Sequence, residues 1–479
     1  MNAQTIAGLE VDETSRASRG IVLGLSFAAG ALLLVFLFPF SAEYSDLERM
    51  NYLTLMFAYF IISVLLLRAV IVRDLSLFEP LSIVTALIFC TFILYPMHDV
   101  LVHDMVSHGK DVSSGCIKAT LIVLASYTLL YILYYTGKDA AAERVLAGQH
   151  PKIMSEQTRK NCNTLMIGIW TVSFIASISV MLQSGMSLSY LFSLGTKGEY
   201  VISEERTLLL FLSNFGITLA TSWVYLLFNA DSVVLKVVLT ILTYLYAFAR
   251  MSRWLVLVVV AAPIVYYHSL TRRRVSWSFV FVTIVLFILV AAWMQIYRYD
   301  FRQGEIADFS FTFDFATLMG PLRSDFTTYR AFYGMVKEIP ANHAYFLGKS
   351  TFLNFFITAI PRAFWPGKPV KAPVSEIIAV SINDSAATSG VAFYNIGEYY
   401  ADFGPLGAMI LMGLFGYILG RFLEPKRQSS DTSDLLAFAV MYPLLFQWTA
   451  RGNTGANVWL TIFALMPVVF LRALGGEER

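Results

Sequence analysis

The chain has 479 residues, of which 57% are hydrophobic and 14% are charged, and its mean hydropathy is +0.64. Soluble domains carry about 45–50% apolar and about 25% charged residues, so this composition excludes that class and indicates a membrane protein. The formal net charge of +2 gives no electrostatic reason to expect a nucleic-acid partner.

Apolar runs long enough to cross roughly 30 Å of hydrocarbon as helices recur along the chain. The first follows nineteen polar residues and lacks a small-residue cleavage site, so we expect an uncleaved span instead of a signal peptide. The predicted fold class is an all-α polytopic membrane protein of about twelve transmembrane helices. The spans are expected at residues 20–40, 51–71, 80–101, 115–136, 164–184, 207–229, 233–250, 253–270, 276–297, 405–422, 434–450 and 455–472.

The distribution of Lys and Arg predicts the orientation, because these residues are enriched in cytoplasmic loops. With a cytoplasmic N-terminus, the seven inner segments hold fourteen Lys and Arg, including Arg272–Arg274, and the five short outer segments hold seven. Both termini are then cytoplasmic, and residues 298–404 lie outside. In a bacterium this means the inner membrane, with the long loop in the periplasm.

The chain therefore divides into three expected regions. Residues 1–297 form a nine-helix transmembrane region, residues 298–404 a large periplasmic loop, and residues 405–479 a three-helix transmembrane region. The loop carries nine Lys or Arg and ten Asp or Glu in an otherwise apolar chain, so we expect the functional site there. Within it, Ser350–Ile360 is too short to span the membrane and is predicted to be an interfacial or re-entrant helix.

Arginines gather at the outer ends of the predicted spans and in the long loop, on the side that the charge rule disfavours. Snorkelling to the lipid headgroups explains any one of them, but a lysine would snorkel equally well. The planar guanidinium is better suited to holding phosphate oxygens through two parallel hydrogen bonds. We therefore expect a diphosphate-headed lipid to be bound by Arg250, Arg253, Arg298, Arg302, Arg323, Arg330 and Arg451.

Three carboxylates are candidates for proton transfer. Glu398 and Asp402 lie one turn apart if GEYYADFG is helical, and Asp325 follows two residues after Arg323. A carboxylate near arginines stays ionised and can accept a proton from a sugar hydroxyl. The alternative is that Glu398 and Asp402 only pair with arginines or cap the next helix.

No cofactor or metal site is expected. Cys90, Cys116 and Cys162 are too far apart in the sequence to form a metal motif, and no nucleotide-binding or zinc-protease motif occurs. His98, His103 and His108 are spaced by five residues and so share no helix face, which makes a metal site with Asp99 and Asp104 the less favoured interpretation.

Four stretches resemble the Wzy family of oligosaccharide repeat-unit polymerases, which act in O-antigen, enterobacterial common antigen and exopolysaccharide synthesis. They are RY at 298–299, LRSDF at 322–326, IPRAFWPGKP at 360–369 and SGVAFYNIGEYYADFGPLG at 389–407. The resemblance covers about residues 245–455 and implies a GT-C-type membrane glycosyltransferase with lipid-linked oligosaccharide substrates. The family's outer-face arginines are matched by Arg253, Arg298, Arg323 and Arg451.

The resemblance implies that a polymer moves from one undecaprenyl diphosphate to the end sugar of another undecaprenyl diphosphate-linked unit. Arginines that neutralise the leaving diphosphate make a metal ion unnecessary for that step. An O-antigen ligase and a lipid-linked oligosaccharide flippase remain as alternatives. Whether a chain-length regulator, a polysaccharide co-polymerase, binds as a partner is left open.

Overall fold

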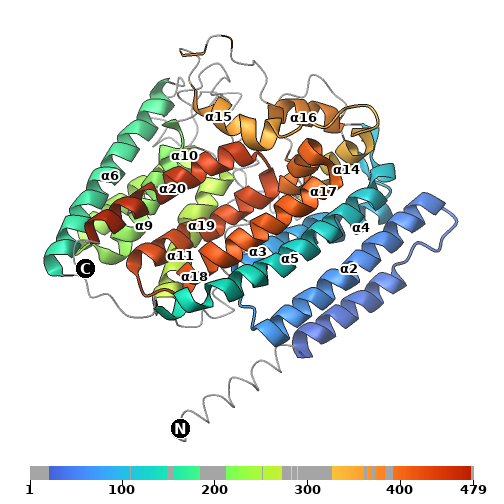
Figure 1. Ribbon diagram of the computed structural model, residues 1–479, viewed down its shortest axis with the longest axis horizontal. Coiled ribbons are helices and arrows are strands. Elements are labelled where there is room, and N and C mark those ends of the chain that lie inside the picture. Colours follow the sequence, from blue (N-terminus) through green and yellow to red (C-terminus); the bar gives the residue numbers. More distant parts are fainter. Residues whose placement is uncertain are drawn as a thin grey trace, which may run out of the picture. The chain divides into compact units, whose positions relative to one another are not determined.

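The computed structural model describes residues 21–107, 109–147, 155–183, 212–250, 252–271, 326–360, 373–382 and 392–475, with residues 282, 289, 364, 365 and 367. These residues are almost entirely helical (Figure 1). The chain divides into two compact units. Unit 1 is drawn from Met1–Gly137, Phe326–Leu347 and Ser375–Gly420, and unit 2 from Lys138–Asp325, Gly348–Val374 and Arg421–Arg479.

Seven described helical segments are long and apolar enough to cross a membrane. They are Asp46–Arg73, Pro80–Leu101, Ser113–Ala142, Glu156–Gln183, Arg253–Thr271, Tyr394–Gln428 and Thr454–Leu474; shorter apolar helices cover Ile21–Phe36, Phe215–Asn229 and Val233–Ala249. The prediction of a polytopic helical membrane protein is therefore confirmed. Each predicted span overlaps a described helix except 276–297, which lies almost wholly outside the described residues.

Unit 1 is built on four long helical segments. They are α2 (Asp46–Arg73), α3 (Pro80–Phe89) continuing through the π-helix η1 (Cys90–Leu94) into α4 (Tyr95–Leu101), α5 (Cys116–Ala147) and α17 (Tyr394–Ile418). A capping box at Ser45 and Glu48 begins α2, and Pro80 occupies the first position of α3. Helix α17 packs closely on α5, because a Cβ on Gly416 would lie only 2.4 Å from the Leu130 carbonyl oxygen.

Short elements cover one end of these helices. A two-residue hairpin pairs β1 (Val106–Ser107) with β2 (Lys110–Asp111), and the 3-10 turn η2 (Ser113–Gly115) leads into α5. From the long loop, α14 (Tyr329–Glu338) packs on η2 and β1, and α16 (Pro373–Ile382) begins near the point where the chain re-enters unit 1. Segments distant in the sequence thus meet at this end.

Unit 2 is a bundle of six longer helices joined mostly by short turns. They are α6 (Glu156–Gln183), α9 (Phe215–Asn229), α10 (Val233–Ala249), α11 (Arg253–Thr271), α19 (Thr432–Arg451) and α20 (Thr454–Gly475). Helix α6 packs along α9, and α11 along α19. The π-helices η3 (Lys349–Leu353) and η4 (Leu419–Leu423) precede the short helices α15 (Asn354–Ala359) and α18 (Glu424–Gln428).

Ion pairs join the helices at one end of unit 2. Arg159 on α6 pairs with Asp231 in the α9–α10 turn at 2.6 Å, and Asp434 on α19 pairs with Lys426 at 2.6 Å and with Arg472 on α20. Buried Glu424 forms an ion pair with Arg427 at 2.6 Å. The arginines at 250, 253 and 451 belong to the turns at the other ends of these helices.

Candidate active site

The candidate carboxylates Glu398 and Asp402 lie on the first, separate part of α17. The backbone of Gly404 is non-helical (φ 72°, ψ −167°) and Pro405 follows, so the helix is broken there. We call residues Tyr394–Phe403 the arm. Its existence agrees with the helical spacing assumed for Glu398 and Asp402, although the predicted span began only at residue 405.

The arm is buried in unit 1. Glu398 and Asp402 are both 0% exposed. The arm packs on α14, where the Phe332 ring lies edge-on to the Tyr400 ring at 5.8 Å. The Tyr400 hydroxyl donates to the Ile339 carbonyl oxygen at 2.5 Å. The two carboxylates are thus held in a packed interior, shielded from bulk water.

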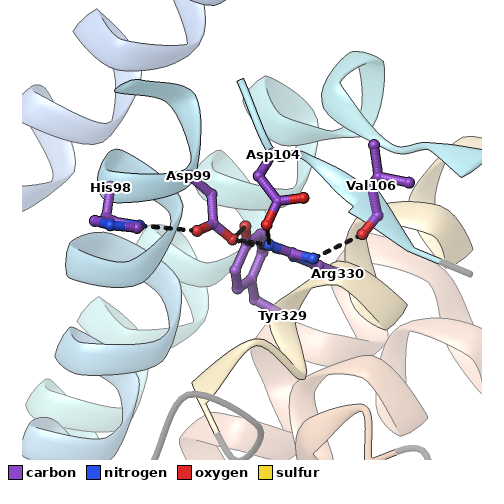
Figure 2. A network of polar contacts seen from close by, with 6 residues as sticks. All are labelled: His98, Asp99, Asp104, Val106, Tyr329 and Arg330. Atoms are coloured by element: carbon purple, nitrogen blue, oxygen red, sulfur yellow. Dashed lines mark hydrogen bonds and ion pairs between the residues drawn. The ribbon is translucent and has the colours of Figure 1, made fainter. Parts of the chain in front are cut away.

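A buried polar network anchors α14 to the end of α4 (Figure 2). The Asp99 carboxylate, 0% exposed, accepts from the Tyr329 hydroxyl at 2.6 Å and from Nε of Arg330 at 3.1 Å. The Arg330 guanidinium also pairs with Asp104 at 2.9 Å and donates to the Val106 carbonyl oxygen at 2.8 Å. Because its donors are used in this way, Arg330 acts in this structure as a clamp between loop and helix ends.

The network perturbs the pKa values of Tyr329 and Arg330. Burial raises the pKa of the Tyr329 phenol, and the adjacent Asp99 raises it further. Burial acts to lower the pKa of Arg330, but its hydrogen bonds to Asp99 and Tyr329 outweigh this and raise it. Tyr329 therefore stays neutral and Arg330 charged at physiological pH.

The less favoured metal interpretation gains no support from this geometry. Arg330 lies where a cation between Asp99 and Asp104 would lie. His98 contacts Asp99 at 3.0 Å, whereas His103 contacts Glu48 at 2.6 Å. Within the described residues, which leave out His108, no three His, Cys, Asp or Glu side chains are placed to hold a metal ion.

In unit 2, Arg250 and Arg253 border the turn between α10 and α11. The Arg250 guanidinium donates to the Ser213 carbonyl oxygen at 2.5 Å and to the Tyr246 hydroxyl at 3.1 Å, and it lies 6.0 Å from the centre of the Trp254 ring. Arg253 is the first residue of α11 and is half-buried. Arg250 thus contacts the residues just before α9 at this end of the bundle.

Arg451 ends α19 at a tight turn that receives part of the long loop. Gly452 and Asn453 both have positive φ, and the Asn354 amide donates to the Asn453 side-chain oxygen at 2.9 Å. The Trp459 indole donates to the Phe355 carbonyl oxygen at 2.9 Å, so α15 is fastened to the start of α20. The residues predicted as an interfacial or re-entrant segment are therefore helical and lie beside Arg451.

Four other predicted site residues lie outside the described part of the chain. They are Arg298, Arg302, Arg323 and Asp325.

The family model for O-antigen polysaccharide polymerase Wzy matches residues 27–475. The chain belongs to the Wzy family. The match covers nearly the whole chain, so the resemblance first drawn from residues 245–455 extends to the helices before residue 200. No curated protein and no solved structure shows a significant match to it. Membership implies glycosyltransferase-type activity on lipid-linked oligosaccharides in a membrane.

The sequence did not reveal the roles of two residues, Asp99 and Lys118, beside the candidate site of this Wzy-family chain. Asp99 was considered only as a metal ligand, although an Asp at the end of an apolar run needs a buried partner. Lys118, in the first turn of α5, lies 5.6 Å from the Tyr400 ring centre and donates to the Val336 carbonyl oxygen at 3.4 Å. Neither partner could be identified without the tertiary structure.

Proposed function

We propose that this protein polymerises lipid-linked oligosaccharide repeat units. It transfers the growing glycan from undecaprenyl diphosphate to the end sugar of an undecaprenyl diphosphate-linked acceptor. The observation that carries the proposal is the Wzy family match over residues 27–475. We also propose a GT-C architecture of twelve spans, with the site on the periplasmic face of the inner membrane. These details, like the named donor and acceptor, go beyond the family match.

In the proposed reaction, an acceptor hydroxyl oxygen attacks the anomeric carbon of the donor. The new glycosidic bond forms while the carbon–oxygen bond to the diphosphate breaks, and the lipid diphosphate leaves. Glu398 accepts the hydroxyl proton, with Asp402 and Asp325 as the other candidates. The arm supports this assignment by placing Glu398 and Asp402 one helical turn apart, on the same face of the helix.

The diphosphate leaving group requires neutralisation of its developing charge. We assign this to the arginines Arg250, Arg253, Arg298, Arg302, Arg323 and Arg451, which makes the reaction independent of a metal ion. Positions 250, 253 and 451 at helix ends support the assignment, since guanidinium groups there can reach the headgroup layer. Arg330 was predicted in the same set, but its contacts with Asp99 and Asp104 favour a structural role.

A deletion strain and the purified protein together test this function. Loss of the protein should leave single-repeat glycolipid on the cell surface, and purified protein should convert lipid-linked repeat units into a ladder of longer products. Surface glycolipid that disappears altogether would indicate a flippase, and unattached polymer would indicate a ligase. Adding a chain-length regulator to the purified reaction would then show whether it changes the ladder.

A further inference from the structure

The break in α17 leaves two carbonyl groups of the arm without their helical donors. In a regular helix, the Ala401 oxygen would accept from the N–H of residue 405 and the Asp402 oxygen from that of residue 406. Residue 405 is proline, which has no N–H, and the non-helical Gly404 turns the chain before Leu406. Unsatisfied carbonyl groups are costly where water is excluded, so other donors are needed.

The segment Tyr345–Leu347 supplies these donors. The backbone N–H of Phe346 donates to the Ala401 carbonyl oxygen at 2.9 Å, and the backbone N–H of Leu347 donates to the Asp402 carbonyl oxygen at 3.0 Å. The Tyr345 ring covers the break itself, because a Cβ on Gly404 would lie 3.0 Å from the Tyr345 hydroxyl oxygen. This segment therefore replaces the missing part of the helix.

The segment Tyr345–Leu347 holds the arm through its backbone N–H groups. The Leu347 side chain is 78% exposed, yet Leu347 adopts φ 54°, a conformation that a leucine rarely takes. Such strain persists only where the surrounding structure imposes it. The strained residue donates to the carbonyl of Asp402, one of the two candidate carboxylate residues.

We propose that Tyr345–Leu347 is a backbone strap that sets the angle of the arm and thereby the positions of Glu398 and Asp402. Phe346 and Leu347 are then positioning residues, which act through their N–H groups and do not touch substrate. The inference rests on the proposed function for the role of the two carboxylates.

The decisive variant is Phe346→Pro, which removes one N–H donor, with Phe346→Ala as the control that keeps it. We expect Phe346→Pro to lower kcat about 10- to 100-fold, as a small misplacement of a catalytic group does, while KM for the lipid-linked donor stays near wild type. Phe346→Ala should retain kcat. If Phe346→Pro does not fold, the double variant Gly404→Ala/Pro405→Ala, which permits a continuous helix, carries the same expectation.

The arm angle can be measured without activity. Spin labels at Phe403, the exposed residue at the end of the arm, and at Leu414, exposed beyond the break, report the distance across the break in a cysteine-free background. Wild type and Phe346→Ala should give the same distribution, and Phe346→Pro or the double variant a shifted or broader one. Wild-type kcat together with an unchanged distribution would overturn the strap.

The same measurements separate the strap from the proposed function. If purified wild-type protein does not polymerise lipid-linked repeat units, the proposed function is wrong. The spin-label distances would still test whether Tyr345–Leu347 sets the angle of the arm. Full activity of both Glu398→Gln and Asp402→Asn would overturn the positioning role while leaving the polymerase assignment intact.

Discussion

At the scale of single residues, the partners of an arginine decide what it can do. Arg330 is held by two carboxylates and a carbonyl group, whereas the Arg250 guanidinium donates to the Ser213 carbonyl oxygen and to the Tyr246 hydroxyl. The positive charge of Arg330 is already neutralised by the buried Asp99 carboxylate, so Arg330 is poorly suited to neutralise a diphosphate. We therefore keep the proposed diphosphate role for the arginines other than Arg330.

We expect Arg330→Met to destabilise the protein by about 3–5 kcal/mol, because it leaves the buried Asp99 carboxylate without its cation. Arg159→Met is the matched control. It breaks an exposed pair with Asp231, in which the side chains are 39% and 61% exposed, and should cost about 1 kcal/mol or less. Thermal unfolding in detergent measures both. A stable Arg330→Met protein that has lost turnover would instead indicate substrate binding by Arg330.

Glu398 is predicted to be the base of the reaction. Glu398→Gln keeps the shape of the side chain but cannot accept the proton, so turnover should fall by about 10²–10⁴-fold. Asp402→Asn should have a milder effect if that residue only pairs with a cation. In vitro polymerisation with purified protein gives the rates. Near-normal turnover by Glu398→Gln would transfer the role to Asp402 or Asp325.

The diphosphate assignment predicts that lysine cannot replace arginine at 253 and 451. A lost charge-assisted hydrogen bond costs about 1.5–3 kcal/mol, or roughly 10- to 150-fold in rate if it is felt only in the transition state. Arg253→Lys and Arg451→Lys should therefore polymerise nearly as poorly as the alanine variants. Arg472→Lys, at the opposite end of unit 2, is the control. Normal polymerisation by both lysine variants would identify 253 and 451 as membrane anchors.

At the scale of elements, close helix contact in unit 1 depends on small residues. The Leu130 carbonyl oxygen leaves no room for a Cβ at Gly416, whereas a Cβ at Gly168 on α6 would meet no atom within 4 Å. Both glycines lie inside helices, so their helix propensities are comparable.

Gly416→Ala should consequently destabilise the protein by about 1–3 kcal/mol through overpacking. Gly168→Ala should be neutral or stabilising by about 0.5–1 kcal/mol, since alanine favours the helix. Thermal unfolding of the two variants side by side checks the contrast. Equal unfolding temperatures would show that α17 can shift on α5 to make room.

At the scale of the whole molecule, the alternation of helices can be followed within unit 1. Segments that should share one side of the membrane do meet there. The Asn51 amide, near the start of α2, donates to the Ser113 carbonyl oxygen at 3.0 Å, and Arg330 from the long loop donates to the Val106 carbonyl oxygen. These contacts agree with the order of the predicted spans. They do not depend on which side of the membrane this end faces.

The orientation is predicted from the Lys and Arg distribution. A cysteine at Asn342, an exposed position after α14, should react with an impermeant reagent in intact spheroplasts. A cysteine at Arg273 should react only after permeabilisation. The reverse pattern would place residues 298–404 in the cytoplasm and would remove the proposed periplasmic site.

The sequence by itself determined that this is a polytopic helical membrane protein, because crossing lipid demands long apolar runs and these leave a strong local signal. It also determined the family, through motifs around the long loop and through the match over residues 27–475. The same contrast made Glu398 and Asp402 candidates for proton transfer, since ionisable residues stand out in such a chain.

Only the tertiary structure decided how these residues are held. Arg330 binds Asp99, which lies 231 positions away in the sequence. Phe346 and Leu347 donate to the carbonyl groups of Ala401 and Asp402, each 55 positions away. Hydrogen bonds at such separations leave no periodic pattern, because they depend on where whole helices pack. Gly404 and Pro405 predict a break in α17 from the sequence. The donors that satisfy the carbonyl groups at this break come from Phe346 and Leu347, which only folding brings beside the arm.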